Sequence, residues 1–256
     1  MECELISLYS SSSGNATLIY CGNRAVLIDC GVSFAMIKRG MEMLSRRPDD
    51  IKAVFITHEH YDHVRGLGQL SKVLRVPVYA TPGTADVLCR RDRVQDINSL
   101  AGPAEVAGMC FTPVPTSHDA AESVGYRIEA DGRCAAVVTD TGYITPEVSD
   151  ALKGCALVML ESNHDKQMLL NGPYPHFLKQ RILSKEGHLS NDDCAAQLSM
   201  LALKGLKKAV LAHISDKNNT PLIAKSAVIN ALGMYGIGLG DFELYAAGAR
   251  PVAVKF

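Results

Sequence analysis

The segment THEHYDH at residues 57–63 constrains this chain more than any other part of its sequence. Three histidines and Asp62 fall within six positions, directly after the apolar run at residues 53–56. A short apolar run of this kind is typical of a buried strand. Imidazole and carboxylate groups are the ligands that zinc and other first-row divalent metals accept. The segment therefore predicts a metal site at the end of a strand.

Alternation along an extended chain indicates how these ligands are aimed. His58, His60 and Asp62 fall on one side because successive side chains point to opposite faces, and His63 begins the turn into the next helix. The competing interpretation is a polar surface loop that is rich in histidine. Four ligand-type residues at ligand spacing argue against that interpretation.

Apolar runs bounded by turn residues predict strands in both halves of the chain, with helices between groups of strands. Continuous apolar runs indicate sheets that are covered on both faces. Two facing sheets with helices outside would satisfy this pattern, although periodicity does not fix the strand order. The predicted strands are residues 4–8, 17–21, 25–29, 53–56, 76–80, 111–116, 123–130, 134–139, 157–160, 209–212 and 242–245. The predicted helices are residues 34–44, 65–74, 191–204 and 224–232.

Composition narrows the class of protein. The 256 residues, 47% of them hydrophobic, suffice for a large core, and we expect residues 1–256 to form one domain. A net charge of −1 argues against binding nucleic acid with the whole surface, so any such contact must be local. The N-terminal residues lack the pattern of a signal peptide, and no stretch has the apolar length of a membrane span, which predicts a cytoplasmic protein.

The cysteines are scattered and include no C-x-x-C pair. In a chain of this length without a secretion signal, we expect reduced thiols in apolar strands and helices. The eight are Cys3, Cys21, Cys30, Cys89, Cys110, Cys134, Cys155 and Cys194.

Five motifs together resemble the metallo-β-lactamase superfamily. Besides residues 57–63, the family has an aspartate after an early strand, a lone histidine, an aspartate that closes a strand and a late histidine. Asp29, His118, Asp140 and His213 match these in order. The resemblance extends over residues 4–246. It implies an α/β fold, the four-layer αββα sandwich, with metals at one edge between the sheets.

The resemblance further implies two divalent metal ions per chain (zinc, manganese or iron) and a metal-bound hydroxide as nucleophile. The implied ligands are His58, His60 and His118 for the first ion, Asp62, His63 and His213 for the second, and Asp140 between them. Asp62 also counts among the catalytic residues, and Asp29 would orient a ligating histidine. Taken singly, a histidine after a strand is usually a surface residue, and an aspartate before Thr-Gly is usually a turn former.

Two later segments resemble the nuclease branches of the superfamily, and most closely the YycJ/WalJ-like branch. They begin at Glu161 (ESNHD) and at Gly187 (GHLSN). The resemblance implies a phosphodiesterase that acts on DNA as a 5′-to-3′ exonuclease. His188 would protonate the leaving oxygen, and Glu161 would orient His188, because a basic alkoxide leaving group benefits from a general acid. The alternative roles are a loop cap for Glu161 and a helix-entry residue for His188.

Substrate contacts must come from the core and its loops. The candidate substrate-binding residues are Asn163 and, in a glycine-containing loop that could cradle a phosphate or be an ordinary hairpin loop, Ser13 and Asn15. Residues 164–188 are basic by two charges and carry aromatic side chains that could stack on bases, although an ordinary solvated helix face explains any single one of these residues better. Two other functions stay open: a thioester or ester hydrolase resembling glyoxalase II, and a scaffold protein that has lost its metals.

Overall fold

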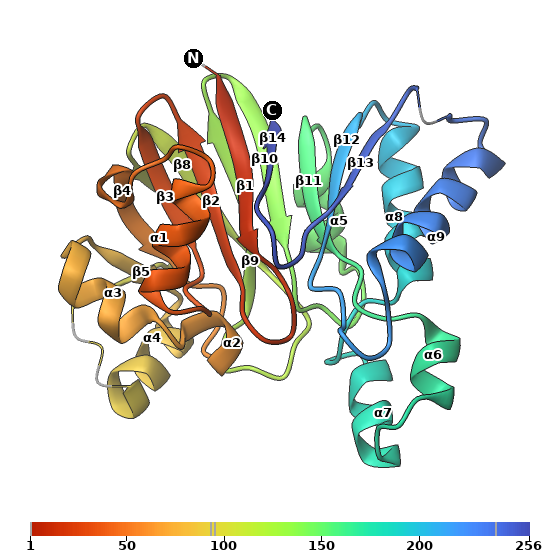
Figure 1. Cartoon of the computed structure of the whole chain (residues 1–256), viewed down its shortest axis with the longest axis horizontal. Coiled ribbons are helices and arrows are strands. Elements are labelled where there is room, and N and C mark those ends of the chain that lie inside the picture. The colour runs from red at the N-terminus through yellow and green to blue at the C-terminus, as the bar shows by residue number, and fades with distance from the viewer. Residues whose placement is uncertain (1, 93, 95, 239) are drawn as a thin grey trace.

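The computed structural model describes residues 2–92, 94, 96–238 and 240–256 (Figure 1). Within these residues the chain forms two seven-stranded sheets. The first sheet is ordered β14 (Val252–Lys255), β1 (Cys3–Tyr9), β2 (Ala16–Cys21), β3 (Arg24–Ile28), β4 (Ile51–Phe55), β5 (Val78–Ala80) and β6 (Ile97–Ser99). The second is ordered β13 (Glu243–Ala246), β12 (Lys208–Ala212), β11 (Leu157–Glu161), β10 (Arg133–Val138), β9 (Val124–Ala130), β8 (Met109–Pro115) and β7 (Ala104–Val106).

Parallel pairing places several strand ends at one edge of the molecule. In the first sheet β3, β4, β5 and β6 run parallel. In the second, β10, β11, β12 and β13 run parallel, in registers that pair Ala135 with Leu157 and Val158 with Ala209. The carboxyl ends of parallel strands lie at the same edge of a sheet, and ligand sites of α/β proteins form outside such edges.

Helices cover the outer face of each sheet (Figure 1). On the first sheet, α1 (Phe34–Glu42) and α3 (Leu67–Leu74) bury Ile37, Met41, Leu67 and Leu70 against strand residues. A short α2 (Tyr61–Val64) precedes α3, and α4 (Pro82–Val87) follows β5. On the second sheet lie α5 (Pro146–Leu152), α8 (Asn191–Ala202) and α9 (Pro221–Met234). Between β11 and α8, the helices α6 (Lys166–Asn171) and α7 (His176–Leu183) project below the sheets in Figure 1.

The central core lies between the two sheets. Phe55 of the first sheet stacks on Phe111 of the second, with 4.4 Å between ring centroids. Tyr126 is fully buried beside them, and its hydroxyl donates to the carbonyl of Ile56 at 2.6 Å. Separate apolar clusters join each sheet to its helices. The predicted αββα sandwich is therefore confirmed.

The strands predicted from apolar runs all occur, with ends shifted by at most two residues. The predicted helix at residues 65–74 occurs as α3, which begins two residues later, after Gly66, where a Cβ atom would lie 2.0 Å from the carbonyl oxygen of Val32. Ser190 caps α8, since its side chain accepts from the backbone N–H of Asp193. The short strands β6, β7 and β14 and the helices α4 to α7 were not predicted, because their apolar patterns are brief.

The expectation that every cysteine is a free thiol is wrong at Cys3 and Cys21, which form a disulfide. The antiparallel pairing of β1 with β2 sets these residues directly opposite each other, with 4.4 Å between their Cα atoms. Cross-strand register is a long-range property, so spacing in the sequence does not reveal it. No helix in the described part of the chain is long and apolar enough to cross a membrane.

Candidate metal centre

A cluster of histidines and acidic residues lies at the edge where the carboxyl ends of β4, β10, β11 and β12 meet. Residues 57–63 follow β4, and Asp140 follows β10 by two positions. Glu161 ends β11, and His213 directly follows β12. His118 comes shortly after β8. The topology thus gathers residues separated by more than 150 positions.

Two groups of ligand-type side chains stand out within the cluster. His58, His60 and His118 offer nitrogen atoms that all lie within 4.8 Å of one another, and His118 Nε2 is 3.2 Å from His60 Nδ1. Asp62, His63 and His213 form the second group on the same criterion.

Asp140 lies between the two groups. Its Oδ2 atom is 3.2 Å from His63 Nε2, and its Oδ1 atom is 3.8 Å from His118 Nε2. The side chain is buried. The structure thus brings together all seven residues that the resemblance implies as ligands, with Asp140 in a bridging position.

The donor set fits divalent cations. His58 is fully buried, and its Nε2 atom has no hydrogen-bond partner among the described residues. Asp140 Oδ2 has no hydrogen-bond partner in the part of the chain that the structure describes, and it lies 3.2 Å from His63 Nε2. An unsatisfied buried polar atom costs about 1–3 kcal/mol and calls for an explanation. A divalent cation accepts electron pairs from such nitrogen and oxygen atoms, so it would satisfy both.

Asp29 fixes the orientation of His63. Its carboxylate lies 2.8 Å from His63 Nδ1 and also accepts from the backbone N–H of Thr57 at 2.8 Å. Because a carboxylate can only accept, His63 carries its proton on Nδ1 and presents Nε2 to the cluster. The carbonyl oxygen of Gly187 lies 3.1 Å from His118 Nδ1 and orients His118 in the same way. The orienting role predicted for Asp29 thus has the required geometry.

Glu161 makes two imidazole contacts where the sequence analysis expected one. Its Oε1 atom lies 2.8 Å from His188 Nδ1 and 2.8 Å from His213 Nδ1. Its Oε2 atom accepts from the backbone N–H groups of Thr141 and Leu189. The carboxylate is fully buried, whereas the His188 side chain is 17% exposed. Glu161 therefore joins His188, on the solvent side, to a residue of the metal cluster.

Burial disfavours the charged form of Glu161, but the facing His188 and the hydrogen bonds outweigh it and lower its pKa to about 2. The carboxylate is consequently ionised at any pH near neutrality. It can then hold both imidazole rings with their Nδ1 protons directed toward it.

Three site residues have left-handed backbone conformations. Asp29, Asp140 and His213 have φ angles of 62°, 55° and 52°. Residues other than glycine rarely adopt this region, and each instance costs roughly 1–3 kcal/mol. In each case the chain turns sharply just after a strand, which places a ligand-type side chain at the edge of the sheet. Such strain is concentrated at functional sites.

The candidate substrate residues differ in exposure. Ser13 is exposed, whereas Asn15 and Asn163 are buried. The backbone N–H of Asn15 donates to the carbonyl of Asp62 at 2.8 Å, and the side-chain amide of Asn163 donates to the carbonyl of His213 at 2.8 Å. The contacts of Asn15 and Asn163 are therefore those of residues that position the cluster.

Two other supporting residues escaped the sequence analysis. The Thr57 hydroxyl lies 3.0 Å from His58 Nδ1 and within hydrogen-bonding distance of Asp29. The Glu59 carboxylate accepts from the backbone N–H of Ala121, which anchors the loop that carries His118. Both residues lie within the histidine-rich segment, so their position next to the predicted ligands is the feature of the sequence that could have identified them.

Comparisons with known proteins agree with this geometry. A family model described as a beta-lactamase superfamily domain matches residues 24–214. The chain belongs to the metallo-β-lactamase superfamily.

Within the superfamily, the chain is similar to YycJ/WalJ-like proteins over most of its length. It is 32% identical to the exodeoxyribonuclease WalJ of Streptococcus pneumoniae over 246 residues, covering 93% of this chain and 91% of that protein. It is 33% identical to the exodeoxyribonuclease YycJ of Bacillus anthracis over 250 residues, with coverages of 93% and 92%.

Solved structures share the fold at lower identity. The metallo-β-lactamase fold protein YhfI of Bacillus subtilis superposes with a TM-score of 0.76 at 14% identity, and all of both chains is covered. A diphosphatase of the PhnP family gives a TM-score of 0.69 at 20% identity, covering 100% of this chain and 98% of that one.

The metallo-β-lactamase centre of this chain should lose metal affinity when Asp29 is replaced. We expect Asp29→Asn to weaken metal binding by about 10- to 100-fold, because Asn cannot hold the Nδ1 proton of His63 as a carboxylate does. Competition with a chelator of known affinity measures the change. Asp49→Asn is a matched control, since Asp49 is exposed and pairs with Arg47 away from the centre. An unchanged affinity in Asp29→Asn would contradict the orienting role.

Metal binding should also depend on pH above the usual range for histidine. Burial disfavours the charged forms of His63 and His213. Asp140 and Asp29 outweigh burial at His63, and Asp140 and Asp62 outweigh it at His213, so the pKa values of both histidines are raised well above normal. A metal must displace these protons. We therefore expect affinity to keep rising with pH above about 6.5, the usual histidine pKa.

Titration calorimetry measures this effect. Binding of Zn²⁺ or Mn²⁺ to the metal-free protein at about pH 7.5, in buffers of different ionisation enthalpy, should reveal released protons. Binding without proton release at that pH would rule out protonated His63 and His213 in the metal-free protein.

Proposed function

We propose that this metal-dependent hydrolase is an exodeoxyribonuclease, a two-metal phosphodiesterase that degrades DNA in the 5′-to-3′ direction. The observation that carries the proposal is the Glu161–His188 pair against the metal cluster, where His188 Nδ1 is 3.5 Å from Asp140 Oδ1. A hydrolase that expels a basic alkoxide needs a proton donor at this place, whereas an activated ester does not. The exodeoxyribonuclease names of the relatives support the same conclusion. Residues 1–256 act as one domain in this proposal.

The proposed ligands follow the two groups of side chains. They are His58, His60 and His118 for one ion, Asp62, His63 and His213 for the other, and Asp140 for both. Zinc, manganese and iron all accept such a set. When bound, such ions lower the pKa of a coordinated water and polarise the phosphodiester under attack.

The chain's own residues complete the reaction. Asp29 and Glu161 hold His63 and His213 in fixed orientations, so the ligand atoms are in place before metal or substrate arrives. His188, partly exposed and held at Nδ1 by Glu161, donates a proton to the oxygen of the departing nucleotide. General acid catalysis of this kind contributes about 10²–10⁴-fold to the rate.

Exposed aromatic side chains support a single-stranded nucleic acid as the bound form. Tyr61, within the metal motif, is 68% exposed, and Tyr143, three residues beyond Asp140, is 42% exposed. Lys185 Nζ lies 5.9 Å from the Tyr143 ring centroid, and Phe177 of α7 is 71% exposed. Aromatic side chains beside cations are the usual platform on which successive bases stack.

Digestion of end-labelled DNA and RNA, single- and double-stranded, with Mn²⁺ or Zn²⁺ tests this function. We expect DNA labelled at the 5′ end to release labelled mononucleotide from the first turnover, while DNA labelled at the 3′ end yields progressively shorter strands. A preparation of Asp140→Ala serves as the blank for contaminating nucleases. A metal-loaded protein that cleaves a thioester but no phosphodiester would replace this proposal with the glyoxalase-like activity.

A further inference from the structure

A cavity opens at the end of the second sheet opposite to the metal centre. Its volume is about 720 Å³, and it lies where β10 and β11 begin. Cys134 is the second residue of β10, and Cys155 precedes β11 by two positions. The same two strands carry Asp140 and Glu161 at their far ends, so the cavity is separate from the metal site.

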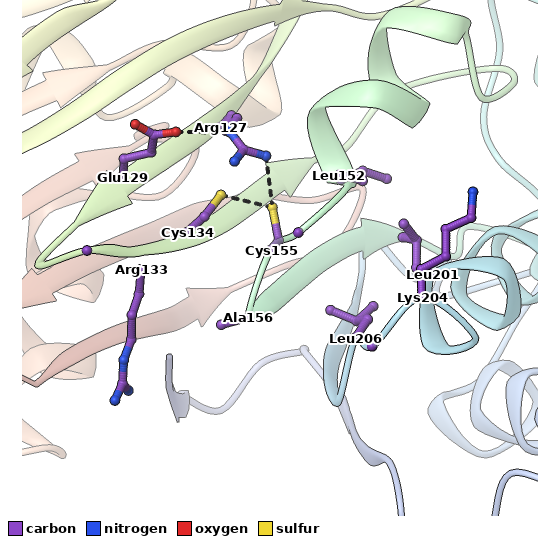
Figure 2. A pocket seen from close by; sticks show the side chains of 13 residues that line it. Arg127, Glu129, Arg133, Cys134, Leu152, Cys155, Ala156, Leu201, Lys204 and Leu206 are labelled. Carbon is purple, nitrogen blue, oxygen red and sulfur yellow. Dashed lines mark hydrogen bonds and ion pairs between the residues drawn. The ribbon is translucent and has the colours of Figure 1, made fainter.

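Two thiols face each other in the wall of this cavity (Figure 2). The Sγ atoms of Cys134 and Cys155 are 3.0 Å apart, about 1 Å longer than a disulfide bond. The backbone holds the pair in register, because the N–H of Ala156 donates to the carbonyl of Cys134 at 2.7 Å. Little movement would therefore join the two sulfur atoms.

A cation is fixed beside the pair. Arg127 Nη1 lies 3.6 Å from Cys155 Sγ and donates to the carbonyls of Ala151 and Lys153 at 2.7 and 2.9 Å. Figure 2 shows Arg127 directed at the sulfur of Cys155, which also faces the sulfur of Cys134. A positive charge next to a thiol favours the thiolate, which is the nucleophilic form.

Cys134 differs from other buried thiols of the chain. Burial raises the pKa of Cys30 to about 12, and burial likewise raises that of Cys194. The hydrogen bond shared with Cys155 outweighs burial and lowers the pKa of Cys134, with a further contribution from Arg127, whereas the same bond and burial raise the pKa of Cys155. Within the pair, one sulfur is thus held toward its thiolate form while the other keeps its proton, as attack and resolution by two thiols require.

We propose that Cys134 and Cys155 are a redox-active dithiol that reacts with low-molecular-weight disulfides through this cavity. The Cys134 thiolate attacks one sulfur of the small disulfide, and one thiol leaves. The Cys155 sulfur then attacks Cys134 Sγ in the mixed disulfide, and the second thiol leaves. Two electrons pass from the cysteines to the small disulfide, and their two protons end on the released thiols.

Exchange with glutathione disulfide, followed by alkylation and peptide mass spectrometry, tests the proposal on the full-length wild-type protein. We expect a peptide cross-linked through Cys134 and Cys155. We also expect the Cys134 thiol to disappear at least about tenfold faster than that of Cys194, in proportion to its larger thiolate fraction. A large excess of glutathione disulfide that leaves both cysteines free to alkylation would overturn the inference.

Variants separate the two roles. Cys155→Ser should stop at a mixed disulfide on Cys134, whereas Cys134→Ser should form neither product at a comparable rate. Cys110→Ser is the matched control, since Cys110 is a free, partly buried cysteine of β8 and should leave the cross-link unchanged. Equal rates of mixed-disulfide formation in Cys134→Ser and wild type would refute the assignment of Cys134 as nucleophile. The wild-type measurement decides the proposal even if a variant folds poorly.

Discussion

Replacing Asp140 with alanine is expected to abolish turnover and to strip metal from both positions. The side chain lies between the two ligand groups, 3.2 Å from His63 Nε2 and 3.8 Å from His118 Nε2. Metal ions supply several kcal/mol of transition-state stabilisation, and each 1.4 kcal/mol is about a tenfold rate change. We therefore expect a loss of at least about 10³-fold in kcat/KM, together with a metal content well below that of the wild type.

Metal analysis and kinetics on the purified variants measure the metal content and kcat/KM. Asp62→Ala should lower metal content less, because Asp62 belongs to only one ligand group. Asp150→Ala is the matched control, since Asp150 is exposed and pairs with Lys153 on the surface. Full metal content and undiminished activity in Asp140→Ala would exclude a bridging role.

Replacing His188 with alanine should separate proton donation from metal binding. We expect the rate on DNA to fall by about 10²–10⁴-fold, because the departing oxygen loses its proton donor. Metal content should stay at the wild-type level, since His188 is not one of the proposed ligands and its hydrogen bond goes to Glu161. On a p-nitrophenyl phosphodiester the loss should be much smaller, because p-nitrophenolate leaves without a proton.

The ratio of the two rates, measured for wild type and variant, is the informative quantity. An equal loss on both substrates would mean that His188 serves binding or structure. His176→Ala is a matched control on the exposed N-terminal turn of α7. Glu161→Gln should behave differently from His188→Ala, because Glu161 Oε1 also contacts His213, so it should impair metal binding as well.

Much of this architecture could be predicted from local patterns. The apolar runs give the strands because a buried strand is apolar on both faces, and β2 and β11 are buried at every position. The histidine-rich segment could be recognised because four ligand-type residues lie within six positions. The ligands on other strands, such as His118 and His213, could be placed only through the resemblance to a known family.

What the sequence did not reveal depends on contacts between distant segments. The Glu161 carboxylate meets His213 across 52 positions, and the backbone N–H of His213 donates to the Ser10 hydroxyl across 203 positions. The last strand β14 pairs with β1 at the start of the chain, so its role depends on register that no local pattern encodes. The thiol pair at the start of β10 and β11 escaped notice for the same reason.

The left-handed residues at the metal centre have a consequence for protein engineering. Among the described residues, eight that are not glycine have positive φ angles, and Asp29, Asp140 and His213 are three of them. Glycine would adopt these conformations without strain, so the backbone and the chemistry favour different residues at the same positions. A designer who needs only an inert scaffold could install glycine there and gain stability, whereas one who needs the hydrolase must accept a less stable fold.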